Sequence, residues 1–359
     1  MDQNSSCNYC KKKVIGFVKG SCRYNLLSKQ PHLSCGNKYI DAFIQDTKSK
    51  RKHCDDFIEW IPCSEIEIYD LIIEGGYSKI FIGKWDPLKR EDKKKLSNIN
   101  IVLKVLKGSE NFDLKFLNEL KIHYQCLGKC SVPFYGLTKL TRMQEYAMVM
   151  KYTIHGDLNK FLNSHSKLSW IKRVEILQNI AKSLNELHKL NIIHRDFHSG
   201  NILVDDNMEI FISDFGLSKF VNDLELSNST DLPSEPVKGV LPYIAPEVLI
   251  GKPYTKKSDI YSLGIIMWEL TSRDRPFSNR SHDILLAMDI IYSKLRPKIV
   301  ERTPEIYQDM MELCWNEDPL KRPDLSQLIN DYENMIKNME QSDQPVMSDI
   351  SGNTEIVKF

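Results

Sequence analysis

Two short stretches contain side chains whose types and spacing could support catalysis. In HRDFHSGN (194–201) Asp196 stands five residues before Asn201, and in ISDFGLSK (212–219) Asp214 precedes a Phe-Gly pair. Transfer of a phosphoryl group from ATP needs carboxylates that hold a metal ion and a further carboxylate that receives the proton of the attacking hydroxyl group. Phosphoryl transfer is therefore the first hypothesis to test against the rest of the chain.

The same reaction needs groups that hold the triphosphate, and the first third of the chain offers two. Gly75 and Gly76 separate two β-rich segments, IEIYDLII and KIFIGKW. Glycine lets backbone amides approach phosphate closely, although a Gly-Gly pair is also typical of a plain hairpin turn. Lys104 lies within the apolar segment INIVLKVL, where a buried ammonium group needs a partner. Glu119, in the helical segment that follows, is the candidate partner; an edge strand that turns Lys104 to solvent is the alternative.

Taken in series, these motifs resemble the catalytic domain of eukaryotic protein kinases over roughly residues 66–338. The resemblance implies an α+β fold with two lobes: a small antiparallel β lobe with one helix (about 66–150) and a large, mainly helical lobe (about 154–338). It implies ATP and Mg²⁺ as cofactors and a protein as substrate. The roles it implies are Asp196 as catalytic base, Asn201 and Asp214 as magnesium ligands, Lys104 as the phosphate-binding cation aimed by Glu119, and Arg195 as the partner of a phosphorylated activation segment.

The resemblance also implies where the nucleotide base would bind, in YAMVMKYTIHGDL. Met150 would lie behind the adenine, and Lys151, Tyr152 and Thr153 would form the strand whose backbone hydrogen-bonds the base. Asp157 would lie beside the ribose, or it would cap the next helix.

The glycine-rich loop departs from the family pattern GxGxxG. Ile73 and Ser78 occupy the first and third glycine positions, so that only Gly75 remains, with Gly76 beside it. This departure leaves open a pseudokinase that binds nucleotide as a scaffold. Because the loop works through backbone amides, Ser78 can keep much of its geometry, and the five ionic and amide groups that the transition state needs are all present. The sequence therefore favours an active enzyme.

HRDFHSGN is also similar to the HxDxHxGN stretch of small-molecule kinases. The Phe-Gly pair after Asp214, together with PYIAPEVL, KKSDIYSLGIIMWEL and CWNEDPLKRPD, instead matches protein kinases. By that match Asp259 braces the catalytic loop, and Arg322 pairs with Glu247 inside the large lobe. A protein substrate is thus favoured over a small molecule.

The identity of the acceptor hydroxyl group is open between Ser/Thr, Tyr and both. His198 and Gly200 stand where serine/threonine and tyrosine kinases carry their typical lysine or arginine, and Val240 replaces a threonine common in serine/threonine enzymes. The closest resemblance is to the tyrosine-kinase-like group, which favours Ser/Thr. For regulation in signal transduction, we expect phosphate on a hydroxyl cluster to dock onto Arg195; the cluster comprises Ser227, Ser229 and Thr230.

Composition and hydropathy bound the remaining possibilities. A formal net charge of +1 leaves no electrostatic footprint for nucleic acid, and no apolar run approaches the ~20 residues of a membrane span. The polar start, MDQNSSCNYCKKK, is not a secretory signal, so a cytoplasmic location is expected. The expected divisions are a Cys-containing leader (1–37), a short amphipathic helix and tether (38–65), the kinase-like domain (66–338) and a disordered tail (339–359).

The leader holds an uneven share of the nine cysteines. Cys7 and Cys10 have zinc-knuckle spacing, with Cys22, His32 and Cys35 as further candidate ligands. The second half lacks a clean CxxC pair, so two interpretations remain: a degenerate zinc knuckle, or a loosely ordered basic leader with free thiols. Either could recruit an adaptor protein.

Hydrophobic periodicity predicts the elements that position these residues. Strands are expected at 66–73, 79–85, 99–106 and 146–154, and one helix at 112–125. Long helical patterns follow near 168–190, 258–272, 283–293, 304–315 and 324–339.

Overall fold

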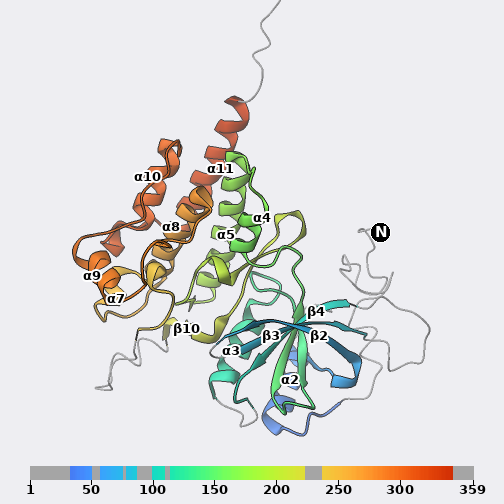
Figure 1. The fold of residues 1–359 in the computed structure, drawn as a ribbon. Helices are drawn as coiled ribbons and strands as arrows, with labels where there is room; N and C mark the ends of the chain where they lie inside the picture. The colour runs from blue at the N-terminus through green and yellow to red at the C-terminus, as the bar shows by residue number, and fades with distance from the viewer. Residues whose placement is uncertain are drawn as a thin grey trace, which may run out of the picture.

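The computed structural model describes residues 33–50, 57–75, 78–86, 99–109, 114–222 and 237–342. Within these ranges a sheet-rich lobe precedes a helix-rich lobe, and the two are joined after β6 (Tyr146–Lys151) (Figure 1). The predicted two-lobed α+β class is confirmed. None of the helices in the described ranges has both the length and the apolar character needed to cross a bilayer.

The first lobe is built on a six-stranded sheet with the order β1-β5-β6-β4-β3-β2. Its other strands are β1 (Glu59–Trp60), β2 (Ile66–Glu74), β3 (Ser78–Trp85), β4 (Ile99–Leu106) and β5 (Phe134–Lys139). Neighbouring strands are antiparallel, except that β1 runs parallel to β5. The antiparallel lobe expected over about residues 66–150 is confirmed, and β1, which lies before those bounds, adds one parallel pair to it.

β4 lies inside the sheet, between β3 and β6, and its side chains alternate between the two faces. Ile101, Leu103 and Val105 are buried together in one apolar cluster. Lys104 points to the opposite face and is only 6% exposed. The alternative of an edge strand that turns this lysine to solvent is therefore excluded.

Two helices contribute to a second apolar cluster of this lobe, where one was expected. α3 (Leu114–Cys126) contributes Phe116 and Leu120, and α2 (Lys38–Lys50) contributes Ile40 and Ile44. β1 follows α2 and joins the sheet, so part of the segment expected to serve as a tether is packed against the domain. Gly136 permits this pairing, because a Cβ atom there would lie 2.1 Å from the carbonyl oxygen of Glu59.

The second lobe surrounds α8 (Lys256–Ser272), in which nearly every side chain is buried. A helix that is buried on nearly all sides belongs in the core of a large lobe, and α5 (Trp170–Lys189) and α10 (Glu305–Cys314) pack against it. The further helices are α4 (Leu158–Ser164), α7 (Pro246–Leu249), α9 (Ile284–Tyr292) and α11 (Leu325–Ser342).

Short strands hold the loops that carry the candidate catalytic residues. β8 (Ile202–Val204) pairs with β9 (Ile210–Ile212), and β7 (Ile192–Ile193) pairs with β10 (Lys219–Phe220). HRDFHSGN lies between β7 and β8, and the Asp-Phe-Gly turn lies between β9 and β10. α11 continues to Ser342, beyond the start expected for the tail, and residues 343–359 lie outside the described ranges.

Candidate active site

Lys104 is the centre of a three-way ionic contact between the lobes. Its Nζ lies 2.5 Å from Glu119 Oε1 on α3 and 2.9 Å from Asp214 Oδ1. Burial of the ammonium group opposes its charge, but the two carboxylates outweigh that cost and raise the pKa of Lys104 above its ordinary value. Lys104 in turn lowers the pKa of Asp214. Lys104 and Asp214 are therefore charged at neutral pH, and the ion pair that the sequence predicts between Lys104 and Glu119 is present.

Asp214 is held in a conformation that only a tight turn requires. Its φ and ψ angles, 60° and 72°, are left-handed, and its carboxylate accepts a hydrogen bond from the amide of Gly216 at 3.3 Å. A Cβ atom on Gly216 would lie 3.3 Å from Asp214 Oδ1 and 3.4 Å from Glu119 Oε2. A glycine at this position lets the Asp214 carboxylate and the Lys104–Glu119 pair come together.

Asp196 and Asn201 are hydrogen-bonded to each other within HRDFHSGN (194–201), the loop between β7 and β8 that is called the catalytic loop below. Asn201 donates through Nδ2 to the backbone oxygen of Asp196 at 2.9 Å and lies 3.5 Å from Asp196 Oδ2. The Asn201 carbonyl oxygen accepts hydrogen bonds from the amide and the hydroxyl group of Ser213, beside Asp214. Because its side-chain nitrogen is bonded to Asp196, the side-chain atom of Asn201 that could hold a cation is Oδ1, which accepts no hydrogen bond from the described residues. Asp196 Oδ1 is buried and, among the described residues, accepts no hydrogen bond.

Asp259, at the start of α8, holds the backbone of this loop through hydrogen bonds to its side-chain carboxylate. It accepts hydrogen bonds from the amides of His194 at 2.9 Å and Arg195 at 3.1 Å, and from His188 Nε2 at 2.8 Å. Arg195 has a left-handed φ of 69°, a conformation that costs energy in a non-glycine residue and needs such support. The bracing role that the sequence predicts for Asp259 is present, and His188 is a partner that the sequence did not reveal.

A column of rings connects α3 to the catalytic loop. Phe215 is fully buried, with its ring centroid 5.3 Å from that of His123 on α3 and 5.7 Å from that of His194. Burial lowers the pKa of both histidines, that of His123 to about 4, so both rings are neutral. His123 Nε2 lies 2.9 Å from the carbonyl oxygen of Val132 and donates to it in the neutral form. Sequence patterns could not identify His123, because its position in the helical pattern is one that any apolar residue could equally occupy.

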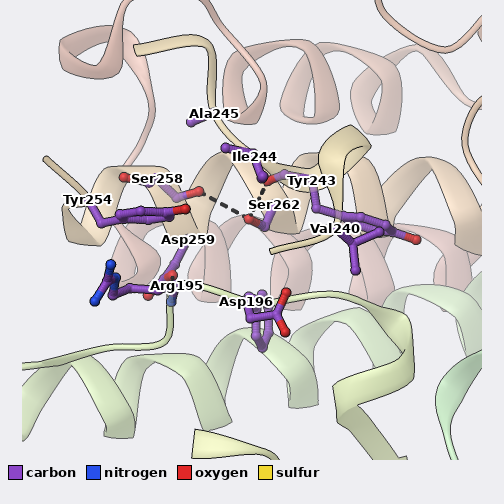
Figure 2. A pocket seen from close by; sticks show the side chains of 11 residues that line it. Arg195, Asp196, Val240, Tyr243, Ile244, Ala245, Tyr254, Ser258, Asp259 and Ser262 are labelled. Carbon is purple, nitrogen blue, oxygen red and sulfur yellow. Dashed lines mark hydrogen bonds between the residues drawn. The ribbon is translucent and has the colours of Figure 1, made fainter. Parts of the chain in front are cut away.

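Arg195 lies in a small pocket between the catalytic loop and the segment that precedes α7 (Figure 2). Its guanidinium group stacks on the ring of Tyr254 at 4.6 Å from the centroid, and the Tyr254 hydroxyl group donates to the carbonyl oxygen of Lys238. Figure 2 shows Asp196 on the other side of the same pocket, facing Val240 and Tyr243. The serine and threonine cluster expected to dock onto Arg195 lies outside the described residues.

The expected nucleotide residues lie along β6 and the chain that follows it. Met150 is buried, and the amides of Lys151 and Tyr152 donate to the carbonyl oxygens of Pro133 and Asn100. The Lys151 side chain makes an ion pair with the buried Asp205, a contact that the sequence did not reveal. Thr153 follows them and is buried as well. The Asp157 side chain accepts a hydrogen bond from the amide of Lys160 at 2.9 Å, so it caps α4, as one of the two interpretations had it.

The glycine-rich turn is described in part. The amide of Gly75 donates to the carbonyl oxygen of Ser78 at 2.9 Å, which closes the hairpin between β2 and β3. Among the described residues, a Cβ atom on Gly75 would meet only that oxygen, at 3.7 Å. Contact with the described residues therefore does not require a glycine at this position. Gly76 lies outside the described residues.

Of the candidate zinc ligands, only Cys35 belongs to the described residues. Burial raises the pKa of its thiol to about 11, and its sulfur accepts a hydrogen bond from the amide of Asn37. Within the described ranges no cluster of three or more His, Cys, Asp or Glu side chains could hold a metal ion. Cys7, Cys10, Cys22 and His32 lie outside those ranges, so a zinc site remains a prediction without support.

Two residues of the catalytic loop, His198 and Ser199, make contacts that the sequence did not reveal. His198 accepts the amide hydrogen of Gly200 at Nδ1, and its Nε2 lies 3.7 Å from Asp196 Oδ2. In the neutral ring the proton must then be on Nε2, which faces the aspartate. Ser199 donates to the buried Glu269 of α8 at 2.9 Å, and burial raises the pKa of Glu269 to about 7.

Comparison with known proteins identifies the family. Residues 66–332 match the family of protein tyrosine and serine/threonine kinases. The chain belongs to this family. Its matched region holds every candidate catalytic and nucleotide-binding residue described above, whereas α2 and β1 precede it.

Individual relatives are similar over most of this chain. A probable serine/threonine-protein kinase of Dictyostelium discoideum is 29% identical over 76% of the chain and 15% of its own length. A serine/threonine-protein kinase of Arabidopsis thaliana is 26% identical over 78% of the chain and 46% of its own length. Ephrin type-B receptor 1 of Gallus gallus is 30% identical over 84% of the chain and 30% of its own length. The chain thus corresponds to less than half of each of these three relatives.

Proposed function

We propose that the chain is an active, ATP- and Mg²⁺-dependent protein kinase that phosphorylates serine or threonine and, less readily, tyrosine. The observation that carries the proposal is the convergence of Lys104, Glu119 and Asp214, which lie on three separate elements. Asp214 is brought into ionic contact with a lysine 110 residues away in the sequence. A purely structural core has little use for a buried ammonium group with two carboxylates, since apolar packing would cost less.

Lys104 would contact the nucleotide phosphates, and Glu119 would keep its ammonium group aimed at them. The Thr153 amide would hydrogen-bond the adenine, since those of Lys151 and Tyr152 are already engaged. The Gly75 turn would cover the phosphates with backbone amides, and this role would account for a glycine that its contacts with the described residues do not require.

The donor set fits a magnesium ion shared with phosphate. Asp214 supplies a carboxylate, and Asn201 supplies an amide oxygen whose companion nitrogen is already bonded. Two protein oxygens leave most of an octahedral shell to phosphate and water, as Mg²⁺ prefers. The ion would neutralise charge on the transferred phosphate group.

Asp196 would orient the acceptor hydroxyl group and receive its proton. The hydroxyl oxygen forms the new bond to the γ-phosphorus while the bond to the ADP oxygen breaks, and the proton passes to Asp196. Asp196 Oδ1 has no donor among the described residues and could accept one from a substrate. His198 and Asn201 would keep Oδ2 in place from the other side.

The acceptor class is proposed from the relatives. The similar proteins of Dictyostelium discoideum and Arabidopsis thaliana are named serine/threonine-protein kinases, whereas the similar Gallus gallus protein is an ephrin receptor. We therefore expect phosphoserine and phosphothreonine to exceed phosphotyrosine in the products.

The test is phosphate transfer from radiolabelled ATP to a mixed protein acceptor, with the full chain and with Mg²⁺ in excess of ATP. Asp196→Asn and Lys104→Met should each lower kcat by at least about 100-fold, a typical contribution of general-base or electrostatic catalysis. Asp206→Asn, an exposed aspartate ten residues further on, serves as the matched control and should leave activity unchanged. Phosphoamino-acid analysis of the products then reports the acceptor class.

Equal background transfer by the wild type and Asp196→Asn would overturn the proposal. In that case ATP binding, measured by calorimetry, would establish the scaffold alternative if the wild type binds the nucleotide and Lys104→Met does not.

A further inference from the structure

α2 lies outside the region that matches the kinase family, yet it is packed against it. The matched region begins at residue 66, and α2 ends at Lys50. Ile40 and Ile44 are buried to at least 99% in the cluster that also contains Phe116 and Leu120 of α3. In α3 these two residues flank Glu119, so apolar contacts of α2 reach the helix that carries the partner of Lys104.

Two contacts join α2 directly to the C-terminal half of α3. The ring of Phe43 meets that of Tyr124 edge-on, with centroids 6.1 Å apart. The Tyr124 hydroxyl group donates to the carbonyl oxygen of Thr47 at 3.2 Å. Thr47 belongs to the last turn of α2, where carbonyl oxygens lack partners within a helix, so the tyrosine satisfies a group that the helix leaves open.

α2 is capped at its first turn and is hydrogen-bonded at its last turn to the segment that enters the sheet. The Asn37 side chain accepts the amide of Tyr39 at 3.0 Å and so caps the first turn. At the other end the fully buried Thr47 hydroxyl group accepts the amide of Ile58 at 3.2 Å. Ile58 immediately precedes β1, which pairs with β5 of the sheet. α2 is therefore tied to the sheet independently of α3.

α3 needs such a support because its other contacts include those with the Asp-Phe-Gly turn, which is neither an α-helix nor a strand of the sheet. It meets the Asp-Phe-Gly turn through the contact of His123 with Phe215, and Asn118 donates to the carbonyl oxygen of Ser218 at 3.4 Å. A shift of α3 of about one ångström would lengthen the 2.5 Å contact between Lys104 and Glu119, and a displacement of that size is costly in an active site.

We infer that α2 is an in-chain brace for α3, and that Phe43 and Tyr124 are positioning residues that act on the reaction through Glu119. This inference rests on the proposed function, since it assigns α2 a share in keeping Lys104 aimed. It extends the catalytic unit of this chain upstream of the family region, from residue 66 to residue 37.

Two variants of the full chain test the brace, one aromatic and one polar. Phe43→Ala removes the ring contact with Tyr124, and Tyr124→Phe removes the hydrogen bond that the hydroxyl group donates to Thr47. Hydrogen–deuterium exchange of the α3 amides should become about two- to tenfold faster in Phe43→Ala, as expected for the loss of one aromatic pair. kcat/KM should fall by a similar factor, and Phe43→Tyr should restore both quantities. Gln45→Ala, on the exposed face of α2, should change neither.

Unchanged exchange of the α3 amides in Phe43→Ala and Tyr124→Phe would overturn the brace. Faster exchange with unchanged kcat/KM in both variants would overturn the positioning role. Failure of the proposed function gives a different result: the wild type would then be no more active than Lys104→Met, before any variant of α2 is considered.

Discussion

The three-way contact at Lys104 makes a prediction that separates stability from activity. Lys104→Met removes the ammonium group and leaves two carboxylates, Glu119 and Asp214, facing each other without a counterion. Glu119 is only 6% exposed, so its charge has little access to water. Adding Glu119→Gln to Lys104→Met removes the stranded charge while it preserves the shape of the side chain.

The expected magnitude follows from the distances. At an effective dielectric constant of about 20, opposite charges about 3 Å apart attract each other by about 5–6 kcal/mol, and desolvation offsets a large part of this. Breaking a buried pair by removing one partner typically costs about 3–5 kcal/mol. We expect Lys104→Met to lower the free energy of unfolding by about 3 kcal/mol, because Asp214 is partly exposed and can be solvated. The double variant should recover at least about half of that loss.

Urea denaturation of the wild type, both single variants and the double variant gives the coupling energy directly. Phosphate transfer should behave differently: Lys104→Met should be inactive, and the double variant should remain inactive despite its recovered stability. If the two substitutions were additive in the free energy of unfolding, the carboxylate would not be electrostatically stranded, and the reasoning from burial would fail.

Three further predictions concern groups outside this contact. Asp259→Ala should lower the free energy of unfolding by about 3 kcal/mol in chemical denaturation, because buried donors of the catalytic loop lose their acceptor; a loss below about 1 kcal/mol would contradict this. His123 has a pKa of about 4 in the folded chain, below its ordinary value of 6.5, so its neutral form stabilises the fold above pH 6.5 and that stability is lost as the pH falls towards 4. Between pH 7 and pH 4, the free energy of unfolding of His123→Met should therefore fall by about 3 kcal/mol less than that of the wild type, as measured by urea denaturation at each pH. An equal fall in both proteins would refute this prediction. Arg322→Lys should reduce the thermal unfolding midpoint, since lysine cannot make the two 2.7 Å hydrogen bonds to Glu247; an unchanged midpoint would contradict the bidentate pair.

Much of the fold could be predicted because the apolar periodicity is local. The strands at 66–73, 79–85 and 99–106 and the helix at 112–125 were each expected close to where β2, β3, β4 and α3 lie. β5 escaped prediction, since FYGLTK is short and interrupted by Gly136, which packs against Glu59 rather than forming a turn. The reason for that glycine lies in a partner strand 77 residues earlier, and no local pattern records it.

The pairing of the candidate site residues could be predicted only through the resemblance. Lys104 alone allowed two interpretations, and burial inside the sheet decides between them. The left-handed backbone of Asp214 and the close approach of Gly216 depend on tertiary contacts with α3. The proton position on His198 depends on one amide of its own loop, and a sequence does not specify it.

The packing of α2 shows most clearly where sequence reasoning stops. The short amphipathic helix that the sequence predicts within residues 38–65 is present, and Ile40, Phe43 and Ile44 form its apolar face. What that face covers could not be read, because any apolar surface would satisfy the pattern. The structure places it against the cluster that α3 shares, so residues that a family comparison leaves out contact the helix that holds Glu119. Removing residues 33–65 in order to obtain a minimal domain would then uncover Phe116 and Leu120 and remove the Thr47 carbonyl oxygen to which the Tyr124 hydroxyl group donates. We accordingly expect the family region alone to be a weaker enzyme than the full chain.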